Sequence, residues 1–395
     1  MGNQVEFPLC SQFDKARMRR MRVLLSAAAL SVLFFPISQS RAADSLPSEL
    51  SNDEFRAIVS ELSESDVTAR YTANNYVSNE LYYQTVIPLV RARAKSGGVY
   101  VGVGPEQNFT YIAAFHPQIA FIIDIRRQNL LELLMYKALF ELAPDRANFV
   151  SLLFSRKRPP EIIRDTSSAV DLLAPYHHVE PDGDLFRTTL EAIEDRLLKV
   201  HKLALSSDDI AGIRNLFTVF RDNGFGISIN GASNGSGITF EQLMTARDRQ
   251  GQADSGIENS FLASEDSYRF VRQLQLKNLI VPLVGDFGGP KAIRAVGAYV
   301  REREGIVSVF YMSNVTGYLD SSQRGKFFES VRTMPLDPAS TFIRAAGPPA
   351  LGAERVPPGR LNGYFTSIVP MLELLDEVRQ GHIQFIPQDI DKISR

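Results

Sequence analysis

Polar residues suited to binding a small ligand follow four short apolar runs of this sequence. The runs are rich in β-branched and aromatic residues, which is typical of buried strands. Because the carboxyl ends of parallel strands meet at one edge of a sheet, we expect the residues that follow them to form a single ligand site. These residues are Gly102, Gly104, Glu106 and Asn108 after the first run, Asp124 at the end of the second, Asp286 after the third, and Ser313 and Asn314 after the fourth.

The first two runs are connected in the way that a nucleotide-binding unit requires. Gly102-x-Gly104 closes the first strand with a tight turn, a short helix follows, and Asp124 lies 20 positions after Gly104. In the first half of a Rossmann-like fold, an acidic residue at this distance binds the hydroxyl groups of a ribose. We therefore expect a nucleoside-like ligand, with Asp124 at its ribose.

The residues of the turn disfavour a phosphate. A dinucleotide-binding turn has a third glycine and free backbone amides, whereas this turn has Gln107 at the third position and Pro105, which lacks an amide hydrogen. Glu106 would also place a negative charge beside the phosphate, at a cost of about 1 to 4 kcal/mol near a surface. The turn therefore favours a nucleoside without phosphate or a cationic ligand, and S-adenosylmethionine is such a compound.

Strands alternate with helices over most of the chain, which predicts an α/β fold. We expect a Rossmann-like, mostly parallel sheet with helices on both faces. The alternation is interrupted between about residues 145 and 272, where we expect a large, mainly helical insertion. The expected helices outside it include 51–62 with a capping box, 79–95 with a kink at Pro88, an amphipathic helix at 130–142, and a last helix near 368–379.

Four segments resemble an uncharacterised bacterial family related to class I S-adenosylmethionine-dependent methyltransferases. They are VYVGVGPEQNFTYI, FIIDIRRQNL, VGDFGGPKAIRAVGAYVRER and VFYMSNV. The resemblance implies a Rossmann-like methyltransferase fold in which Gly102 and Gly104 lie under the cofactor and Asp124 holds its ribose. Tyr100 and Val101 stand where methyltransferases usually carry an acidic residue, and no Asn/Asp-Pro-Pro-Tyr motif follows the later strand, so the resemblance names no methyl acceptor.

Methyl transfer needs an aligned acceptor and, for some acceptors, a base. Asp286 and Tyr311 are our candidates for the base. We expect no metal, because the one cluster of imidazoles and carboxylates, in the segment 177–184, lacks a recognised ligand spacing and is typical of a solvated acidic loop.

The first 42 residues are typical of a secretory signal peptide. A basic segment, Met18 to Arg22, precedes an apolar run of 15 residues, and Ser40-Arg41-Ala42 has small residues at the positions that a cleavage site requires. The run is short for a membrane span. We expect translation to begin at Met18 or Met21 and the mature protein to be periplasmic or secreted, with an uncleaved membrane anchor as the alternative.

Cleavage would remove six basic and two acidic residues and the sole cysteine, Cys10, leaving a formal net charge of −6. This charge gives no general attraction to nucleic acid or to an anionic membrane surface. Because S-adenosylmethionine is made and used in the cytoplasm, an exported chain would lack its methyl donor. Two functions therefore remain open: a methyltransferase, or an exported binding or structural protein that has the same fold without catalysis.

Overall fold

The computed structural model describes residues 1–2, 45–64, 74–162, 168–232, 237–248, 251–253, 258–346 and 365–383. Residues 3–42 of the predicted leader, with its two start positions and its cleavage site, lie outside these ranges. The chain divides into two units, Met1–Ala42 and Ala43–Arg395, and every helix and strand named below belongs to the second unit. None of the helices in the described ranges has both the length and the apolarity that a membrane span requires.

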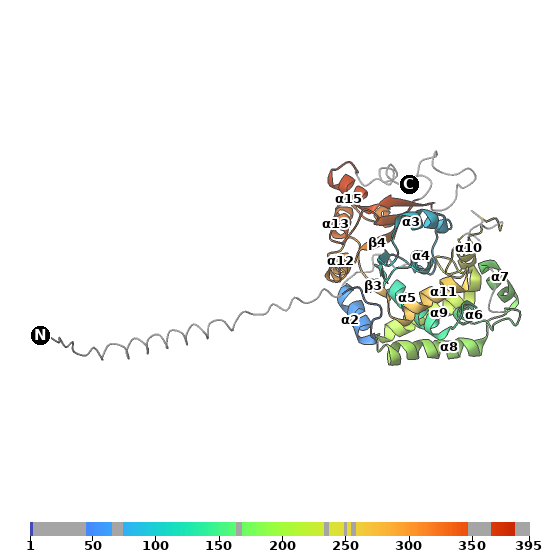
Figure 1. Cartoon of the computed structure of the whole chain (residues 1–395). Coiled ribbons are helices and arrows are strands. Elements are labelled where there is room, and N and C mark those ends of the chain that lie inside the picture. The colour runs from blue at the N-terminus through green and yellow to red at the C-terminus, as the bar shows by residue number, and fades with distance from the viewer. Residues whose placement is uncertain are drawn as a thin grey trace. The chain divides into compact units, whose positions relative to one another are not determined.

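Six strands form one sheet in the order β3-β2-β1-β4-β5-β6 (Figure 1). The first five run parallel, and β6 pairs with β5 in the antiparallel direction. The predicted α/β class with a mostly parallel sheet is confirmed. The strands are β1 Val99–Gly102, β2 Ile119–Asp124, β3 Ile280–Val284, β4 Val307–Ser313, β5 Thr341–Ala346 and β6 Phe365–Pro370.

Helices cover the sheet on two sides, so the central strands are buried throughout, as in other parallel sheets. In Figure 1, α12, α13 and α15 lie to the left of the sheet and α4, α5 and α11 to its right. Strand β2 packs against α12 and also against α5. The six helices are α4 Gln107–Phe115, α5 Arg127–Leu142, α11 Glu265–Leu276, α12 Ala292–Glu302, α13 Ser321–Arg332 and α15 Met371–Arg379.

Helix α5 is buried on all sides rather than on one face. Every residue from Asn129 to Glu141 is buried, including the charged Glu132 and Lys137. The expected amphipathic pattern does not hold, because β2 and β3 cover one side of the helix while α6, α8 and α9 cover another. Helix α5 therefore lies between the sheet and a second layer of helices.

That second layer comes from the segment between α5 and α11. Its described residues form helices, together with isolated β-bridges. Helix α11 spans the expected end of the insertion at about residue 272, and it packs against α4 and α5 beside the sheet. The elements of this segment are α6 Arg146–Leu153, α7 Ala169–Leu173, η2 Ala174–His178, α8 Gly183–Asp195, the π turn η3 Arg196–Val200, α9 Ser207–Asn223, η4 Gly224–Gly226 and α10 Phe240–Thr245.

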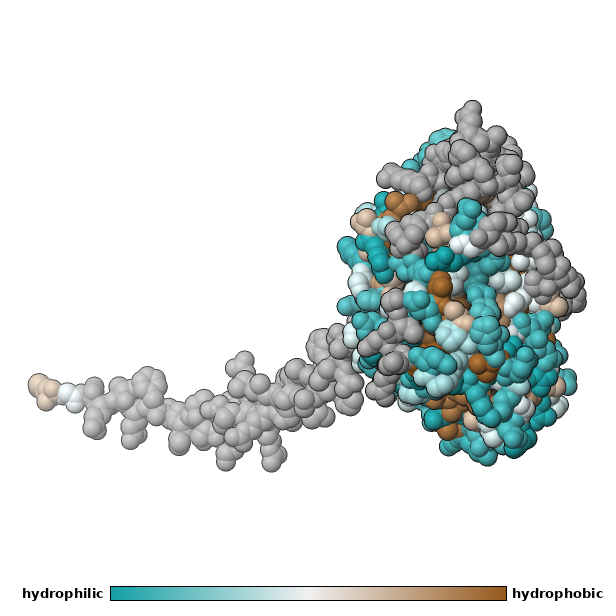
Figure 2. Space-filling view, turned by 90° about the vertical axis from the view of Figure 1, so that its right-hand side faces the viewer, coloured by the Kyte–Doolittle hydropathy of each residue, from teal (hydrophilic) through white to brown (hydrophobic). Residues whose placement is uncertain are grey.

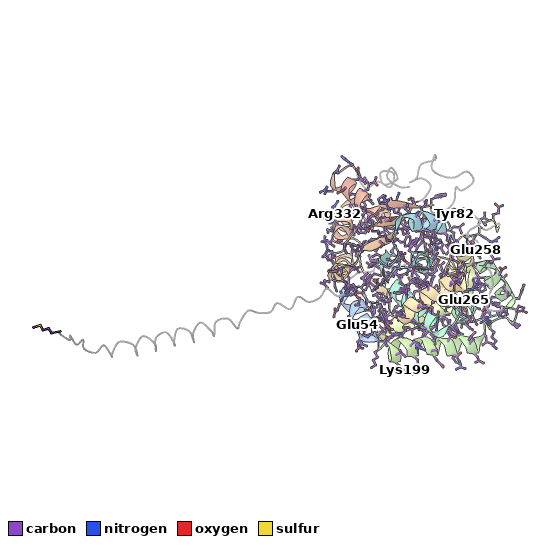
Figure 3. All side chains as sticks on the ribbon, viewed as in Figure 1. Glu54, Tyr82, Lys199, Glu258, Glu265 and Arg332 are labelled. Carbon is purple, nitrogen blue, oxygen red and sulfur yellow. The ribbon has the colours of Figure 1, made fainter. Side chains whose placement is uncertain are left out.

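Two expected helices are wrong in part. The segment 79–95 forms the 3-10 helix η1 Tyr83–Val86 and then α3 Ile87–Arg93, with Pro88 in the first turn of α3 and not at a kink. Proline is tolerated there because the first amides of a helix have no partner within the helix. The segment expected to be a helix near 368–379 begins as strand β6, since its backbone pairs with β5. Tyr82, labelled in Figure 3, stacks on Phe365 of β6 with ring centroids 5.6 Å apart.

The predicted capping box is present at the start of helix α2, Asn52–Leu62. The Glu54 amide donates to Ser51 Oγ over 3.2 Å, and the Ser51 amide donates to Glu54 Oε2 over 2.8 Å. Glu54 is labelled in Figure 3. The molecular face seen in Figure 2 is mostly hydrophilic, with apolar side chains scattered over it.

Candidate functional site

A pocket opens where β1, β2, β3 and β4 end. Its empty space is about 950 Å³, including the part that is open to solvent. In the strand order, the chain passes from β3 on one side of β1 to β4 on the other side. Ligands of open α/β sheets bind at such a change of direction, at the carboxyl ends of the strands.

Some of the site residues predicted from the sequence line the pocket and others do not. Gly102, Glu106 and Asn108 do not line it. The predicted residues that do line it are Gly104, Asp124, Asp286, Tyr311, Ser313 and Asn314.

Gly102 and Asn108 hold the turn between β1 and α4. The side-chain nitrogen of Asn108, Nδ2, donates to the carbonyl oxygens of Val103, Gly104 and Pro105 over 2.8 to 3.0 Å. A Cβ atom on Gly102 would lie 1.9 Å from Asn108 Oδ1, so only glycine fits there. Gly104 has a φ of +78°, which also favours glycine. The glycines thus allow a tight turn whose carbonyl groups are tied to one buried side chain.

The Glu106 carboxylate faces the interior instead of the pocket. Glu106 is fully buried, and both of its side-chain oxygens lie 3.2 Å from the Ser78 amide. Burial raises the pKa of Glu106 to about 8. The negative charge that we expected from Glu106 beside a phosphate is therefore absent from the pocket lining, and the carboxylates that do line the pocket come from other positions.

Asp124 stands at the end of β2 with its carboxylate in the pocket wall. Its Oδ1 atom accepts a hydrogen bond from the Arg126 amide over 2.8 Å and lies 3.4 Å from Arg126 Nη1. Burial raises the pKa of Asp124, and the neighbouring Arg126 guanidinium opposes this effect. The Asp124 side chain also accepts from the Gly104 amide, so it joins the end of β2 to the glycine turn.

Asp286 begins the loop after β3 and is partly exposed. Its Oδ1 atom accepts a hydrogen bond from the Gly288 amide over 2.8 Å. The backbone of this loop is also held by Glu64, whose carboxylate accepts from the amides of Asp286, Lys291 and Ala292 over 2.9 to 3.2 Å. Glu64 is thus the anionic group at the start of α12, a position at which negative charge is stabilising, and Asp286 is left facing the pocket.

The residues at the end of β4 converge on Glu80, which the sequence reasoning missed. The Tyr311 hydroxyl donates to Glu80 Oε1 over 2.9 Å, and the Ser313 hydroxyl donates to the same oxygen. Gln107 Nε2 donates to Glu80 Oε2 over 3.1 Å. Burial raises the pKa of Glu80, although these three hydrogen bonds oppose the rise. Glu80 is only 2% exposed, yet it forms part of the pocket lining.

The segment that carries Glu80 contributes a wall of the pocket. Asn75, Ser78 and Asn79 line the pocket together with Glu80. The signal in the sequence was the connector with Asn74, Asn75 and Asn79 before the first core strand, a segment that could fold over a ligand but is also typical of a helix-capping loop. The helical segment between α5 and α11 contributes Ile229 to the lining, and the Ile229 carbonyl accepts a hydrogen bond from the Tyr76 amide over 3.0 Å.

The pocket is acidic. Among the described residues that line it, Glu80, Asp124 and Asp286 carry carboxyl groups, and Arg126 carries the only guanidinium or ammonium group. Because Arg126 lies against Asp124, its charge is partly balanced within the pair. Apolar surface comes from neighbouring side chains, including Phe287 and Tyr318, of which Tyr318 is 58% exposed. Such a pocket suits a flat, apolar ring joined to polar or cationic groups.

The acidic segment 177–184 has structural contacts. His177 Nε2 lies 2.8 Å from Glu241 Oε1, and Asp182 caps α8 by accepting from the Leu185 amide over 2.7 Å. Within the described ranges, no group of three or more histidine, cysteine, aspartate or glutamate side chains is arranged to hold a metal ion.

Comparison with known families gives two matches to one family model. No curated protein matches this sequence. A family model described as "Domain of unknown function (DUF7790)" matches residues 75–219 and 220–372, a span that includes every residue lining the pocket. Since the two matches together cover more than half of the chain, this protein belongs to the DUF7790 family.

Proposed function

We propose that the pocket binds S-adenosylmethionine and that the protein transfers its methyl group to an acceptor. The strand order supports a Rossmann-like arrangement, because 3-2-1-4-5-6 is the order of the doubly wound dinucleotide-binding sheet, here with its last strand reversed. The resemblance of the four segments to class I methyltransferases points in the same direction.

The position of Asp124 carries the proposal. Its carboxylate lies in the pocket wall at the end of β2, and it is joined to Gly104 of the β1–α4 turn by a hydrogen bond. A carboxylate there can accept hydrogen bonds from both hydroxyls of a ribose, as in other nucleotide-binding sheets. The base would then lie toward the loop after β3, where Phe287 offers apolar surface.

The charge of the pocket favours this ligand over a nucleotide. A phosphate would meet the carboxylates of Glu80 and Asp286, and repulsion between charges about 4 Å apart costs roughly 1 to 4 kcal/mol near a surface. The sulfonium and ammonium groups of S-adenosylmethionine would instead be attracted. The acidity that supports this conclusion comes from Glu80, Asp124 and Asp286, and not from Glu106.

The two candidates for a base differ in their surroundings. Burial raises the pKa of the Tyr311 hydroxyl well above its ordinary value, and this hydroxyl already donates to Glu80. Tyr311 therefore acts as a donor that orients its neighbours, since its phenolate is strongly disfavoured. Asp286 is partly exposed to the pocket and remains our candidate for accepting a proton from the methyl acceptor.

The predicted leader favours a second candidate function. An exported chain would be separated from the cytoplasmic supply of S-adenosylmethionine, and the same pocket would then bind a different ligand without methyl transfer. In this case the protein is a periplasmic or secreted binding protein that retains the fold.

Calorimetry on the purified chain tests the proposal directly. We expect S-adenosylmethionine and S-adenosylhomocysteine to bind with micromolar or tighter dissociation constants, and adenosine 5′-triphosphate to bind at least tenfold more weakly because of the acidic lining. If neither adenosyl compound binds at millimolar concentration, the methyltransferase function is ruled out and the binding-protein function remains.

A further inference from the structure

Three buried carboxylates in the described part of the chain have no ion pair, Glu80, Glu106 and Glu132, and of these only Glu80 lines the pocket. Asp209 pairs with Arg127 at 2.6 Å, and Glu141 lies 2.9 Å from Lys137 Nζ. Asp124 lies 3.4 Å from Arg126. In the described part of the chain, Glu80 has no ion pair, although it is almost fully buried.

The hydrogen bonds around Glu80 favour its ionised form. Ser78 Oγ donates to Gln107 Oε1, so the Gln107 amide nitrogen faces Glu80 and donates to Oε2. Tyr311 and Ser313 donate to Oε1. Three donated hydrogen bonds stabilise the ionised carboxylate and fix its orientation, although burial is the larger effect and raises the pKa of Glu80. Burial alone opposes this charge, and a buried anion without a counter-ion is costly.

The Glu80 carboxylate also has access to a ligand. Glu80, Tyr311 and Ser313 all line the pocket. A carboxylate has about two acceptor positions on each oxygen, so Oε1 is filled by Tyr311 and Ser313, whereas Oε2 accepts only from Gln107 and keeps one position for a ligand. Tyr311 also brings an aromatic ring to the pocket lining, and aromatic rings attract cations. An anion, hydroxyl groups and an aromatic ring together are the partners that a protonated amine requires.

We propose that Glu80 is the recognition residue for a protonated amine bound in the pocket. The inference rests on the proposed function only in taking an adenosyl compound as the ligand of the pocket. The binding of an ammonium group by Glu80 does not require methyl transfer. Two sources of the ammonium group are compatible with the pocket. One is the amino-acid portion of an adenosyl ligand, and the other is a separate amine, which would be the methyl acceptor.

Two adenosyl ligands distinguish the sources. S-adenosylhomocysteine carries the ammonium group, whereas 5′-methylthioadenosine lacks the amino-acid portion. If the adenosyl ligand supplies the ammonium group, Glu80→Gln will lower the affinity for S-adenosylhomocysteine by about 10- to 150-fold in calorimetry and leave the affinity for 5′-methylthioadenosine unchanged. If a separate amine supplies it, Glu80→Gln will leave the affinity for both adenosyl ligands unchanged.

Benzylammonium and its neutral counterpart, benzyl alcohol, test the separate amine. In ligand-observed NMR with the wild-type chain, we expect benzylammonium to bind and benzyl alcohol to bind much more weakly, with the preference lost in Glu80→Gln. This measurement remains informative if no adenosyl ligand binds, in which case the methyltransferase proposal fails while the ammonium site is still tested.

Glu106→Gln is the matched control. It replaces another fully buried carboxyl near Glu80 that does not line the pocket, and we expect it to leave the affinity for every probe unchanged. Thermal melts establish that each variant is folded. If the wild type shows no preference for benzylammonium over benzyl alcohol, the proposal is overturned even if Glu80→Gln does not fold.

The pH dependence provides an independent check. Burial raises the pKa of Glu80, so affinity for an ammonium group should fall as the pH is lowered through this pKa, and the fall should be absent in Glu80→Gln. The other ionisable groups that face Glu80 or share the pocket are Tyr100, Glu106, Tyr111, Asp124, Arg126, Asp286, Tyr311 and Tyr318. Equal affinity of folded wild type and Glu80→Gln for S-adenosylhomocysteine and for benzylammonium would overturn the proposal.

Discussion

Asp124 serves the fold and the proposed ligand with the same carboxylate. Its hydrogen bonds to the Arg126 and Gly104 amides connect the end of β2 to the glycine turn. Its place in the pocket wall leaves it able to bind a ribose. A substitution at this position should therefore affect both stability and binding, and the two effects can be measured separately.

Asp124→Asn keeps the side-chain shape and one acceptor oxygen but removes the charge. We expect the affinity for S-adenosylhomocysteine to fall by about 10- to 150-fold, because a charge-assisted hydrogen bond is worth roughly 1.5 to 3 kcal/mol. Without ligand, stability should fall by about 1 kcal/mol, since the buried carboxylate accepts backbone hydrogen bonds. Thermal melts with and without ligand measure both quantities.

Asp182→Asn provides the control for Asp124→Asn. Asp182 caps α8 and pairs with Lys157 at 2.6 Å, and it does not line the pocket, so its substitution should leave binding unchanged. Equal ligand-induced stabilisation of wild type and Asp124→Asn would show that Asp124 does not hold a ribose.

At the scale of elements, α5 packs against the sheet on one side and against the helical layer on another. It is buried along 13 consecutive residues, and it starts directly after Asp124 and Arg126 of the pocket wall. The bidentate ion pair of Arg127 with Asp209 joins its first turn to α9, at 2.6 and 2.7 Å. The position of Asp124 and Arg126 in the pocket wall therefore depends on how α5 packs against the helical layer.

Leu139→Ala tests the importance of this packing. Leu139 is fully buried in α5, and removing a buried leucine side chain typically costs about 2 to 5 kcal/mol of stability. Leu198→Ala, at a position that is 39% exposed in the π turn after α8, should cost much less, within about 0.5 kcal/mol. Denaturant unfolding of the two variants measures the contrast, and similar losses would show that α5 is not held between two layers.

At the scale of the whole molecule, the compartment decides which of the two proposed functions is available. We predict that the protein isolated from its native cell begins at about residue 43, after removal of the leader. N-terminal sequencing measures this directly. An intact Met18 or Met21 on cytoplasmic material would contradict export, and it would place the protein beside its proposed methyl donor.

Local sequence patterns were sufficient to predict most of the sheet and the edge at which the pocket opens. Strands β1, β2, β3 and β4 were recognisable because buried parallel strands are short, apolar and β-branched, and those properties depend on neighbouring residues. The last helix was expected to begin near residue 368 but begins at Met371, because residues 365–370 pair with β5 as strand β6. The segment 347–359, which contains proline and glycine, separates the two paired strands in sequence, so local patterns do not reveal the pairing. Likewise, the burial of α5 on all sides depends on α6, α8 and α9.

The sequence by itself therefore determined where a site would form, through the rule that parallel strands end at one edge. Only the tertiary structure decided which carboxylates face that site. Glu106 lies in the predicted turn but is directed toward the Ser78 amide in the interior. Glu80 reaches Tyr311 and Ser313 across 231 and 233 positions of sequence. Side-chain direction in a turn and contacts over such separations result from packing of the whole chain, and no local spacing of residues encodes them.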